Sequence, residues 1–426
     1  MRALTRITAL ARAGFDDYVV YEKDGVWTFA GGCLASVTLD ATHVHVRGAV
    51  EFDEPWSGSP GAAVRGVLDR LPLPEWHAYG RVHFGFAGLL PGLRLVGAGE
   101  PGGELMRLLV PRTEVRISGD EVEIRGEDRA RVQAILDAPA LRQPPEPSPV
   151  DVRTDGADYR QRVAQAVKEI RLGQYQKVIL SRVLRIPFRV DLAATYELGR
   201  RGNTPARSFL MRLGGREAAG FSPEVVVTVD AAGRVATQPL AGTRAFGRGA
   251  EQDAAARTEL ESNPKEVFEH AVSVRTAQEE LRRVCRPGSV RVGDFMGVKE
   301  RGSVQHLASL VCGDLDDGRS GWDALEAVFP AVTASGIPKR ESLDAISRLD
   351  ESRGLYSGAV VRASHDGSLD AALVLRAIYQ EPDGAWLRAG AGIVADSTPE
   401  REFEETCEKL ISVAPFVVPL SPGPAQ

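Results

Sequence analysis

Apolar residues recur at spacings of three and four in four stretches of the chain, the pattern of one face of an amphipathic α-helix. These stretches lie at 60–71, 159–172, 263–285 and 398–411. Gly173 follows the second stretch and is expected to end its helix, because glycine readily adopts the left-handed conformation at a helix C-terminus.

The third predicted helix carries a clear N-terminal signal. Asn263 can act as its N-cap, Pro264 suits the first helical position, and Glu266 occupies the capping-box position. Its predicted apolar face consists of Val267, Ala271, Val274, Leu281 and Cys285.

The fourth predicted helix should begin near Thr398 and Pro399, since proline is favoured in the first turn. The residues that it is expected to bury are Phe403, Cys407, Leu410 and Ile411.

Runs rich in β-branched and aromatic residues, bounded by turn residues, predict many strands. Hairpins are expected at 18–32, with its turn at Asp24 and Gly25, and at 115–126. Further strands are expected at 177–188, 209–213, 224–229, 234–240, 356–364, 369–380 and 386–394. Because hairpins follow one another between the helices, the pattern predicts an α+β fold with large, mostly antiparallel sheets packed with helices.

A proline-rich stretch at 136–150 divides the chain into two regions. We expect it to be a surface connector between a strand-rich N-terminal subregion, 1–135, and a catalytic region, 151–420. The 426 residues, of which 43% are hydrophobic, can bury a large core, so we expect 1–426 to form a single globular unit.

The composition excludes several classes of protein. A formal net charge of -6 without blocks of like charge argues against a nucleic-acid binder. The four cysteines are far apart and the chain has seven histidines in no zinc-ligand spacing, so we expect reduced thiols in a cytoplasmic protein. No secretory h-region and no run of eighteen apolar residues occurs, so no membrane association is expected.

Acidic residues on two predicted helices are the first candidates for chemistry. Glu402 and Glu405 share a stripe with Lys409, roughly opposite the apolar face of their helix, and Glu266 and Glu269 lie three apart on another. Taken alone, these patterns favour solvated helix faces. If the two helices faced each other, their carboxylates would form the oxygen-rich site that Mg²⁺ prefers.

Seven strings in the second half of the chain resemble the chorismate-utilising enzymes, a family that includes anthranilate, aminodeoxychorismate, isochorismate and salicylate synthases. In chain order they are PLAGTRA, ESNPKEVFEH, ERGSVQHL, FPAVTASGIPK, GLYSGAV, LRAGAGIV and PEREFEETCEKL. The resemblance extends from about Tyr175 to the end of the final helix, and it implies the fold of that family.

The resemblance implies a base and an acid on opposite faces of the chorismate ring. Lys177 matches the lysine that acts as general base on water, which requires its neutral form, favoured by burial or by a nearby cation. Glu224 matches the general acid that protonates the departing C4 hydroxyl. Ala241 stands where aminodeoxychorismate synthases often have a nucleophilic lysine, so a covalent lysine route is not expected.

The same resemblance implies the other site residues. Magnesium would be held by Glu269 and Glu402, with Glu266 and Glu405 farther out or acting through water. Substrate would be bound by Gly242, Thr243, Thr333, Tyr356, Arg376, Gly390, Gly392 and Lys409. His306 lies near the ring in relatives, where it is either catalytic or a hydrogen-bonded structural histidine.

Taken as a whole, the strings look most like siderophore-type salicylate synthases, which convert chorismate to isochorismate and then to salicylate and pyruvate. The alternatives are an isochorismate synthase that stops after the first step, an anthranilate synthase-type enzyme, and a catalytically inactive relative. No GxCxG glutaminase motif occurs, so we expect no glutaminase subunit and a monomer that acts on the small molecule chorismate.

Overall fold

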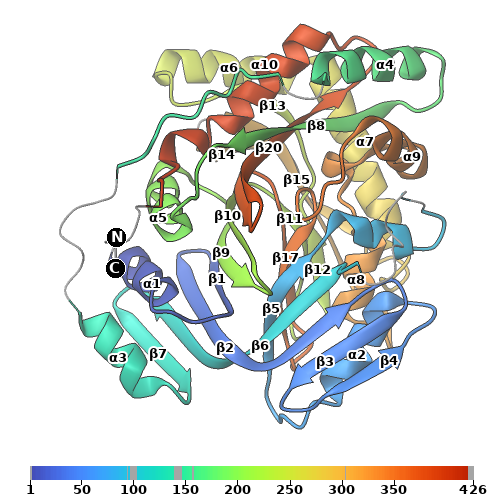
Figure 1. Ribbon diagram of the computed structural model, residues 1–426. Coiled ribbons are helices and arrows are strands. Elements are labelled where there is room, and N and C mark those ends of the chain that lie inside the picture. The colour runs from blue at the N-terminus through green and yellow to red at the C-terminus, as the bar shows by residue number, and fades with distance from the viewer. Residues whose placement is uncertain are drawn as a thin grey trace.

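The computed structural model describes residues 2–93, 95, 103–138, 146–155, 158–302 and 304–420 (Figure 1). Among these residues the strands are β1 (Tyr18–Lys23), β2 (Val26–Leu39), β3 (His43–Gly48), β4 (Phe52–Pro55), β5 (His77–Val82), β6 (Met106–Ser118), β7 (Glu121–Gly126), β8 (Lys177–Ile186), β9 (Arg207–Leu213), β10 (Arg216–Ser222), β11 (Val225–Val229), β12 (Arg234–Thr237), β13 (Leu240–Ala245), β14 (Arg291–Arg301), β15 (Val304–Asp314), β16 (Gly336–Ile337), β17 (Ala359–Ser364), β18 (Leu369–Leu373), β19 (Ala377–Glu381) and β20 (Gly384–Ile393).

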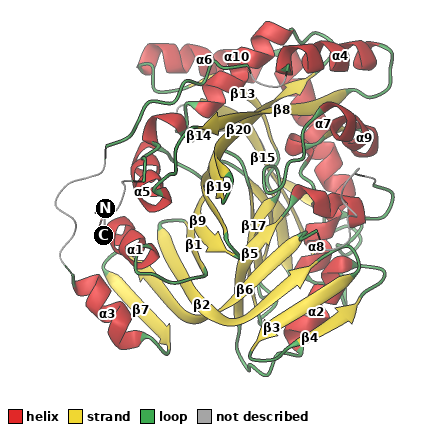
Figure 2. Cartoon of the chain, viewed as in Figure 1, coloured by secondary structure: helices red, strands yellow, loops and turns green. Residues whose placement is uncertain are grey.

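The helices lie around the outside of these strands (Figure 2). They are α1 (Arg2–Ala11), α2 (Pro60–Asp69), α3 (Arg129–Asp137), α4 (Tyr159–Arg171), α5 (Leu192–Gly202), α6 (Ala250–Ser262), α7 (Pro264–Leu281), α8 (Gly321–Val328), α9 (Lys339–Leu349) and α10 (Pro399–Leu410). In this part of the chain, no helix combines the length and the apolar character needed to cross a membrane.

The strands form one antiparallel hydrogen-bonded network. Its main order is β16–β8–β20–β19–β10–β9–β1–β2–β6–β5–β17–β18–β11–β12–β15. Strands β3 and β4 extend from β2, β7 pairs with β6, and β13 and β14 pair with β15. The predicted α+β fold with large antiparallel sheets is therefore confirmed.

The N-terminal strands share this network with the rest of the chain, because β1 pairs with β9 and β5 pairs with β17. Two apolar cores lie between strands and helices, and a third consists mainly of strand side chains such as Tyr21, Tyr79 and Phe209. Residues 139–145 of the predicted connector at 136–150 lie outside the described residues, and α3 continues into its start as far as Asp137.

The strongest local signals are found where they were predicted. Asp24 and Gly25 form the turn between β1 and β2, and β6 and β7 form the second hairpin. The four predicted helices are α2, α4, α7 and α10. Asn263 caps α7 by accepting from the backbone N–H groups of Lys265 and Glu266.

Two predicted strands are each broken in two. The stretch 369–380 forms β18 and β19, separated at Arg376, whose φ of +51° does not fit an extended strand. The stretch 234–240 forms β12 and β13, interrupted at Gln238 and Pro239, since proline cannot donate to a ladder.

Helices α1, α3, α5, α6, α8 and α9 were not predicted. In α6 the reason is clear, because Leu260 is its one buried residue and no apolar stripe exists to be recognised. Ile411 is 48% exposed, contrary to prediction; it is the C-cap residue of α10, and the next apolar residues, Val413 and Ala414, are buried instead.

The predicted face of α7 is also partly wrong. Val267 and Ala271 are only half-buried, whereas His270, Ser273 and Ala277 are buried. Polar groups occupy part of the inner face here: the Nε2 atom of His270 lies 2.6 Å from Ser309 Oγ, although its Nδ1 atom has no partner among the described residues.

Candidate active site

A single cavity of about 510 Å³ collects the residues that sequence analysis selected. It lies among β8, β13, β15, β20, α7 and α10. Its lining includes all fifteen predicted site residues: Lys177, Glu224, Gly242, Thr243, Glu266, Glu269, His306, Thr333, Tyr356, Arg376, Gly390, Gly392, Glu402, Glu405 and Lys409. Helices α7 and α10 therefore do meet at one site, although 133 residues separate Glu269 from Glu402 in the chain.

The carboxylates at the start of α7 are paired with cations. Glu269 Oε2 accepts a hydrogen bond from Lys177 Nζ at 2.9 Å, and both side chains are mostly buried. Glu266 Oε1 accepts from Arg244 Nη1 at 2.9 Å, so its carboxylate does not close the capping box that the sequence predicted. Arg244 also binds Glu259 and so ties α6 and α7 to β13.

Helix α10 is turned so that part of its acidic stripe is buried. Glu402 is only 5% exposed, which corrects the interpretation of a solvated stripe opposite the apolar face. Four residues later, Thr406 lies on the same helical face, and its hydroxyl accepts from Nε of the buried Arg182 of β8 at 2.7 Å. Glu402 therefore shares a buried face with a polar contact that hydrophobic periodicity could not reveal.

Glu405 and Lys409 face the same cavity. Lys409 Nζ donates to Glu405 Oε1 and to the carbonyl oxygen of Gly390, each at 2.8 Å. Although burial raises the pKa of Glu405, the charge and hydrogen bond of Lys409 outweigh it and lower that pKa overall. Lys409 thus joins α10 to β20 across the cavity wall.

Glu402 differs from its neighbours because no ion pair holds it among the described residues. Burial and the negative charge of Glu405 raise the pKa of its carboxyl group. A bound divalent cation would supply the missing positive charge, so the donor set fits Mg²⁺. In the described ranges, however, no three His, Cys, Asp or Glu side chains are gathered at a metal-binding distance. The carboxylates of this cavity therefore match the common kind of Mg²⁺ site, in which one or two carboxylates are completed by waters and substrate oxygens.

Glu224 is held as a neutral acid. Its side chain is buried, and burial raises its pKa to about 8, although Thr333 and the positive charge of Lys177 act in the opposite direction. Thr333 Oγ1 donates to Glu224 Oε1 at 2.7 Å. A carboxyl group in this state can donate a proton at neutral pH.

The His306 ring lies between an arginine and a backbone carbonyl oxygen. Its Nε2 atom lies 2.8 Å from Arg376 Nη2, which can only donate, so the ring proton must be on Nδ1. Nδ1 is 3.1 Å from the carbonyl oxygen of Gly242. Burial and the charge of Arg376 lower the pKa of His306 to about 3. This neutral ring orients Arg376, an arrangement that suits a positioning role.

Two glycines bring backbone close to the cavity. Gly242 has a φ of +67°, and a Cβ atom there would lie 2.8 Å from Glu266 Oε2. At Gly390, a Cβ atom would lie 2.8 Å from Tyr356 Oη and 2.7 Å from the carbonyl oxygen of Leu180. Both positions therefore require glycine.

Sequence analysis missed several cations in the cavity wall, among them Arg244, Lys265, Arg388 and Arg401. Arg244 could have been found, since it directly follows the Gly242–Thr243 pair. Arg388 has no local signal, because an arginine in a strand usually points to solvent.

Comparison with known proteins identifies the family. The family model described as chorismate binding enzyme matches residues 19–415. The chain belongs to this family. It is a chorismate-binding enzyme that acts on small-molecule chorismate.

Two curated relatives show how similar this chain is to individual members of the family. The salicylate synthase of Mycolicibacterium paratuberculosis is 51% identical over 414 residues, 96% of this chain and 91% of the relative. Anthranilate synthase component 1 of Haloferax volcanii is 38% identical over 284 residues, 64% of this chain and 54% of the relative.

Solved structures of similar fold agree with the family assignment. Anthranilate synthase component I from Streptococcus pneumoniae has a TM-score of 0.76 at 24% identity, covering 91% of this chain and 92% of the other. The menaquinone-specific isochorismate synthase MenF from Escherichia coli has a TM-score of 0.75 at 20% identity, with 96% and 90% coverage.

Proposed function

We propose that this enzyme is a salicylate synthase that converts chorismate through isochorismate to salicylate and pyruvate. The observation that carries the proposal is the base–acid pair in one cavity: Lys177 on one wall, and the buried Glu224, held protonated, on another. The 51% identity with a salicylate synthase supports the complete two-step reaction.

In the first step, water adds at C2 of chorismate while the hydroxyl group leaves C4. Lys177 Nζ accepts a proton from the attacking water, and Glu224 donates a proton to the departing oxygen, so that water is released. The ring double bonds shift between the two carbons, and the product is isochorismate. The overall reaction is an isomerisation with no net change in protons.

Substrate carboxylates would be held at two places. Arg376, oriented by His306, can grip the pyruvyl carboxylate with two parallel hydrogen bonds, and the Tyr356 hydroxyl lies beside Gly390 on the same wall. Glu269 and Glu402 would hold magnesium, which would neutralise the ring carboxylate when bound.

In the second step, the C2 hydrogen moves to the pyruvyl methylene carbon as the C–O bond to the ring breaks, giving salicylate and pyruvate. This step needs a fixed side-chain conformation more than it needs an acid or a base. We assign to Arg376 and Tyr356 the role of holding that conformation.

Product analysis is the direct test. Chorismate and magnesium should yield salicylate and pyruvate in equal amounts. Isochorismate alone would instead identify an isochorismate synthase and contradict the second step. Adding ammonia should produce no anthranilate fluorescence, because we propose that Lys177 directs water, and not ammonia, to C2.

The pH dependence of the first step should report the protonation of Glu224. Since this carboxyl group has a pKa of about 8 and must be protonated to act, the rate from chorismate should fall above about pH 8 by roughly tenfold per pH unit. Salicylate formation from supplied isochorismate should show no such limb. A chorismate rate that stays constant to pH 10, or an identical limb with both substrates, would contradict the acid assignment.

A further inference from the structure

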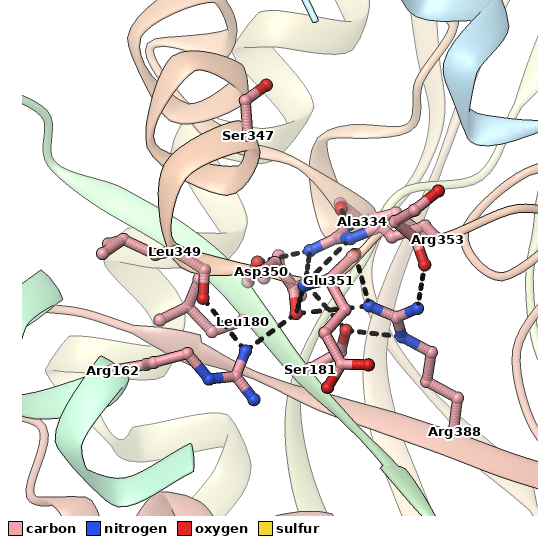
Figure 3. Close-up of polar contacts among 12 residues, drawn as sticks. Arg162, Leu180, Ser181, Ala334, Ser347, Leu349, Asp350, Glu351, Arg353 and Arg388 are labelled. Carbon is pink, nitrogen blue, oxygen red and sulfur yellow. Dashed lines mark hydrogen bonds and ion pairs between the residues drawn. The ribbon is translucent and has the colours of Figure 1, made fainter. Parts of the chain in front are cut away.

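Behind the cavity wall lies a cluster of buried charges that the proposed mechanism does not use. We name it the Asp350 cluster; it contains Asp350, Arg162, Arg353, Arg388 and Ser181 (Figure 3). The side chain of Asp350 is fully buried and accepts from all three arginines and from Ser181 Oγ. Although burial raises the pKa of Asp350, the charges of the arginines outweigh this effect and lower it overall.

Arg353 connects this cluster to both sides of the reaction centre. Its Nη1 atom donates to the carbonyl oxygen of Ala334 at 2.7 Å, and its Nη2 atom donates to that of Ile179 at 2.6 Å. Ala334 follows Thr333, the residue that donates to Glu224. Ile179 lies two residues after Lys177 on β8, and both line the cavity, as alternate residues of a strand share a face.

The guanidinium group of Arg353 has little freedom to move. Asp350 Oδ2 holds its Nε and Nη2 atoms at 3.0 and 2.8 Å. Its Cζ atom also lies 4.5 Å from the centre of the Phe84 ring and 5.8 Å from that of Tyr356. A group fixed on so many sides can act as a rigid spacer.

The other two arginines have different surroundings. Arg388 lines the cavity, but its donors bind Ser181 Oγ, Asp350 and the carbonyl oxygens of Glu351 and Ser352. Arg162 lies on α4, where it binds Asp350 Oδ1 and the carbonyl oxygen of Leu349, each at 3.0 Å. Arg162 therefore shares the same carboxylate with Arg353 without lining the cavity.

Backbone pairing of β16 with β8 already joins the base strand carrying Lys177 to the chain that follows the Thr333 loop. We propose that Arg353, fixed by Asp350, is a positioning residue that sets where this loop, whose Thr333 bonds the acid Glu224, lies relative to that strand. The inference rests on the proposed function, since it assigns the spacing to the step that uses both groups. Isochorismate elimination uses neither group, so it depends much less on this spacing.

The test compares Arg353→Lys with Arg162→Lys on both substrates. A lysine at 353 keeps the charge but cannot reach Asp350, Ala334 and Ile179 together. A displacement of 1 Å can cost about 10²-fold, so isochorismate formation from chorismate should fall by about that factor. Salicylate formation from supplied isochorismate should change by less than about fivefold, and Arg162→Lys should preserve the wild-type ratio of the two rates.

Thr333→Val provides a second, milder variant that removes the last hydrogen bond of the same chain. Thr333→Val should lose activity with chorismate and keep it with isochorismate. In the double variant with Arg353→Lys, the loss in activation free energy should be less than the sum of the two single losses. Equal losses on both substrates, or unchanged chorismate turnover in Arg353→Lys, would overturn the positioning role. If Arg353→Lys does not fold, Arg353→Gln, compared on the two substrates in the same way, decides. A wild-type protein that makes salicylate from neither substrate would instead contradict the proposed function.

Discussion

Replacing Lys177 with alanine should lower the rate of isochorismate formation from chorismate by about 10²–10⁴-fold, the usual contribution of a general base. The lysine side chain lines the cavity, where it donates to Glu269, so its removal opens no hole in an apolar core. The fold should therefore be kept, which circular dichroism and the thermal midpoint can check.

The same variant separates the two steps. Supplied isochorismate should still lose pyruvate at a measurable rate, because elimination needs no base. Lys168→Ala, an exposed position on α4, serves as the matched control and should behave like the wild type. Full activity of Lys177→Ala on chorismate would show that the base has been assigned wrongly.

How far the sequence predicted the site differs between its two acidic helices. Asn263 and Pro264 located the start of α7 because caps and first-turn prolines are local signals. The start of α10 was also marked by a local signal, but no local signal indicated the orientation of Glu402. Helical phase placed Glu402 away from Phe403 and Cys407, whereas in the fold Glu402 is buried on the same face as Thr406, which accepts from the buried Arg182.

The contacts that make the cavity chemically capable are long-range ones. Lys177 meets Glu269 across 92 residues of sequence, and Thr333 meets Glu224 across 109. Spacing within an element cannot reveal such pairs, so the resemblance to a family was needed to bring them together. Arg376 shows a second limit of prediction from sequence. Its left-handed backbone lies between β18 and β19, whereas the pattern of apolar residues predicts one continuous strand there.

The Asp350 cluster had no counterpart in the sequence analysis. Its arginines come from α4, β20 and the turn after α9, and each looks like an ordinary surface residue in its own segment. Only the folded chain shows that one buried carboxylate gathers them behind Tyr356. Polar groups on inner faces, which are absent from hydrophobic patterning, thus determine much of the geometry of this site.

Removing divalent cations with EDTA should abolish turnover of chorismate, and adding Mg²⁺ should restore it. Lys177 Nζ donates to Glu269 Oε2 at 2.9 Å, so in this arrangement the carboxylate, and not a water molecule, is the partner of the amine. Base catalysis therefore requires the Glu269 carboxylate to be engaged elsewhere, and cation binding at Glu269 and Glu402 would do so.

Cation binding can also be measured without turnover. Ligand at 100 times its dissociation constant stabilises a folded protein by about 2.7 kcal/mol, so Mg²⁺ should raise the thermal midpoint of the wild type. Glu402→Gln should lose most of that rise, since it replaces the buried carboxylate that has no cation partner among the described residues, whereas Glu404→Gln, on the outer side of α10, should keep it. Unchanged rates in EDTA would remove the carboxylates from the mechanism. A thermal midpoint that rises equally in both variants would place the cation away from Glu402 while leaving the base and acid assignments intact.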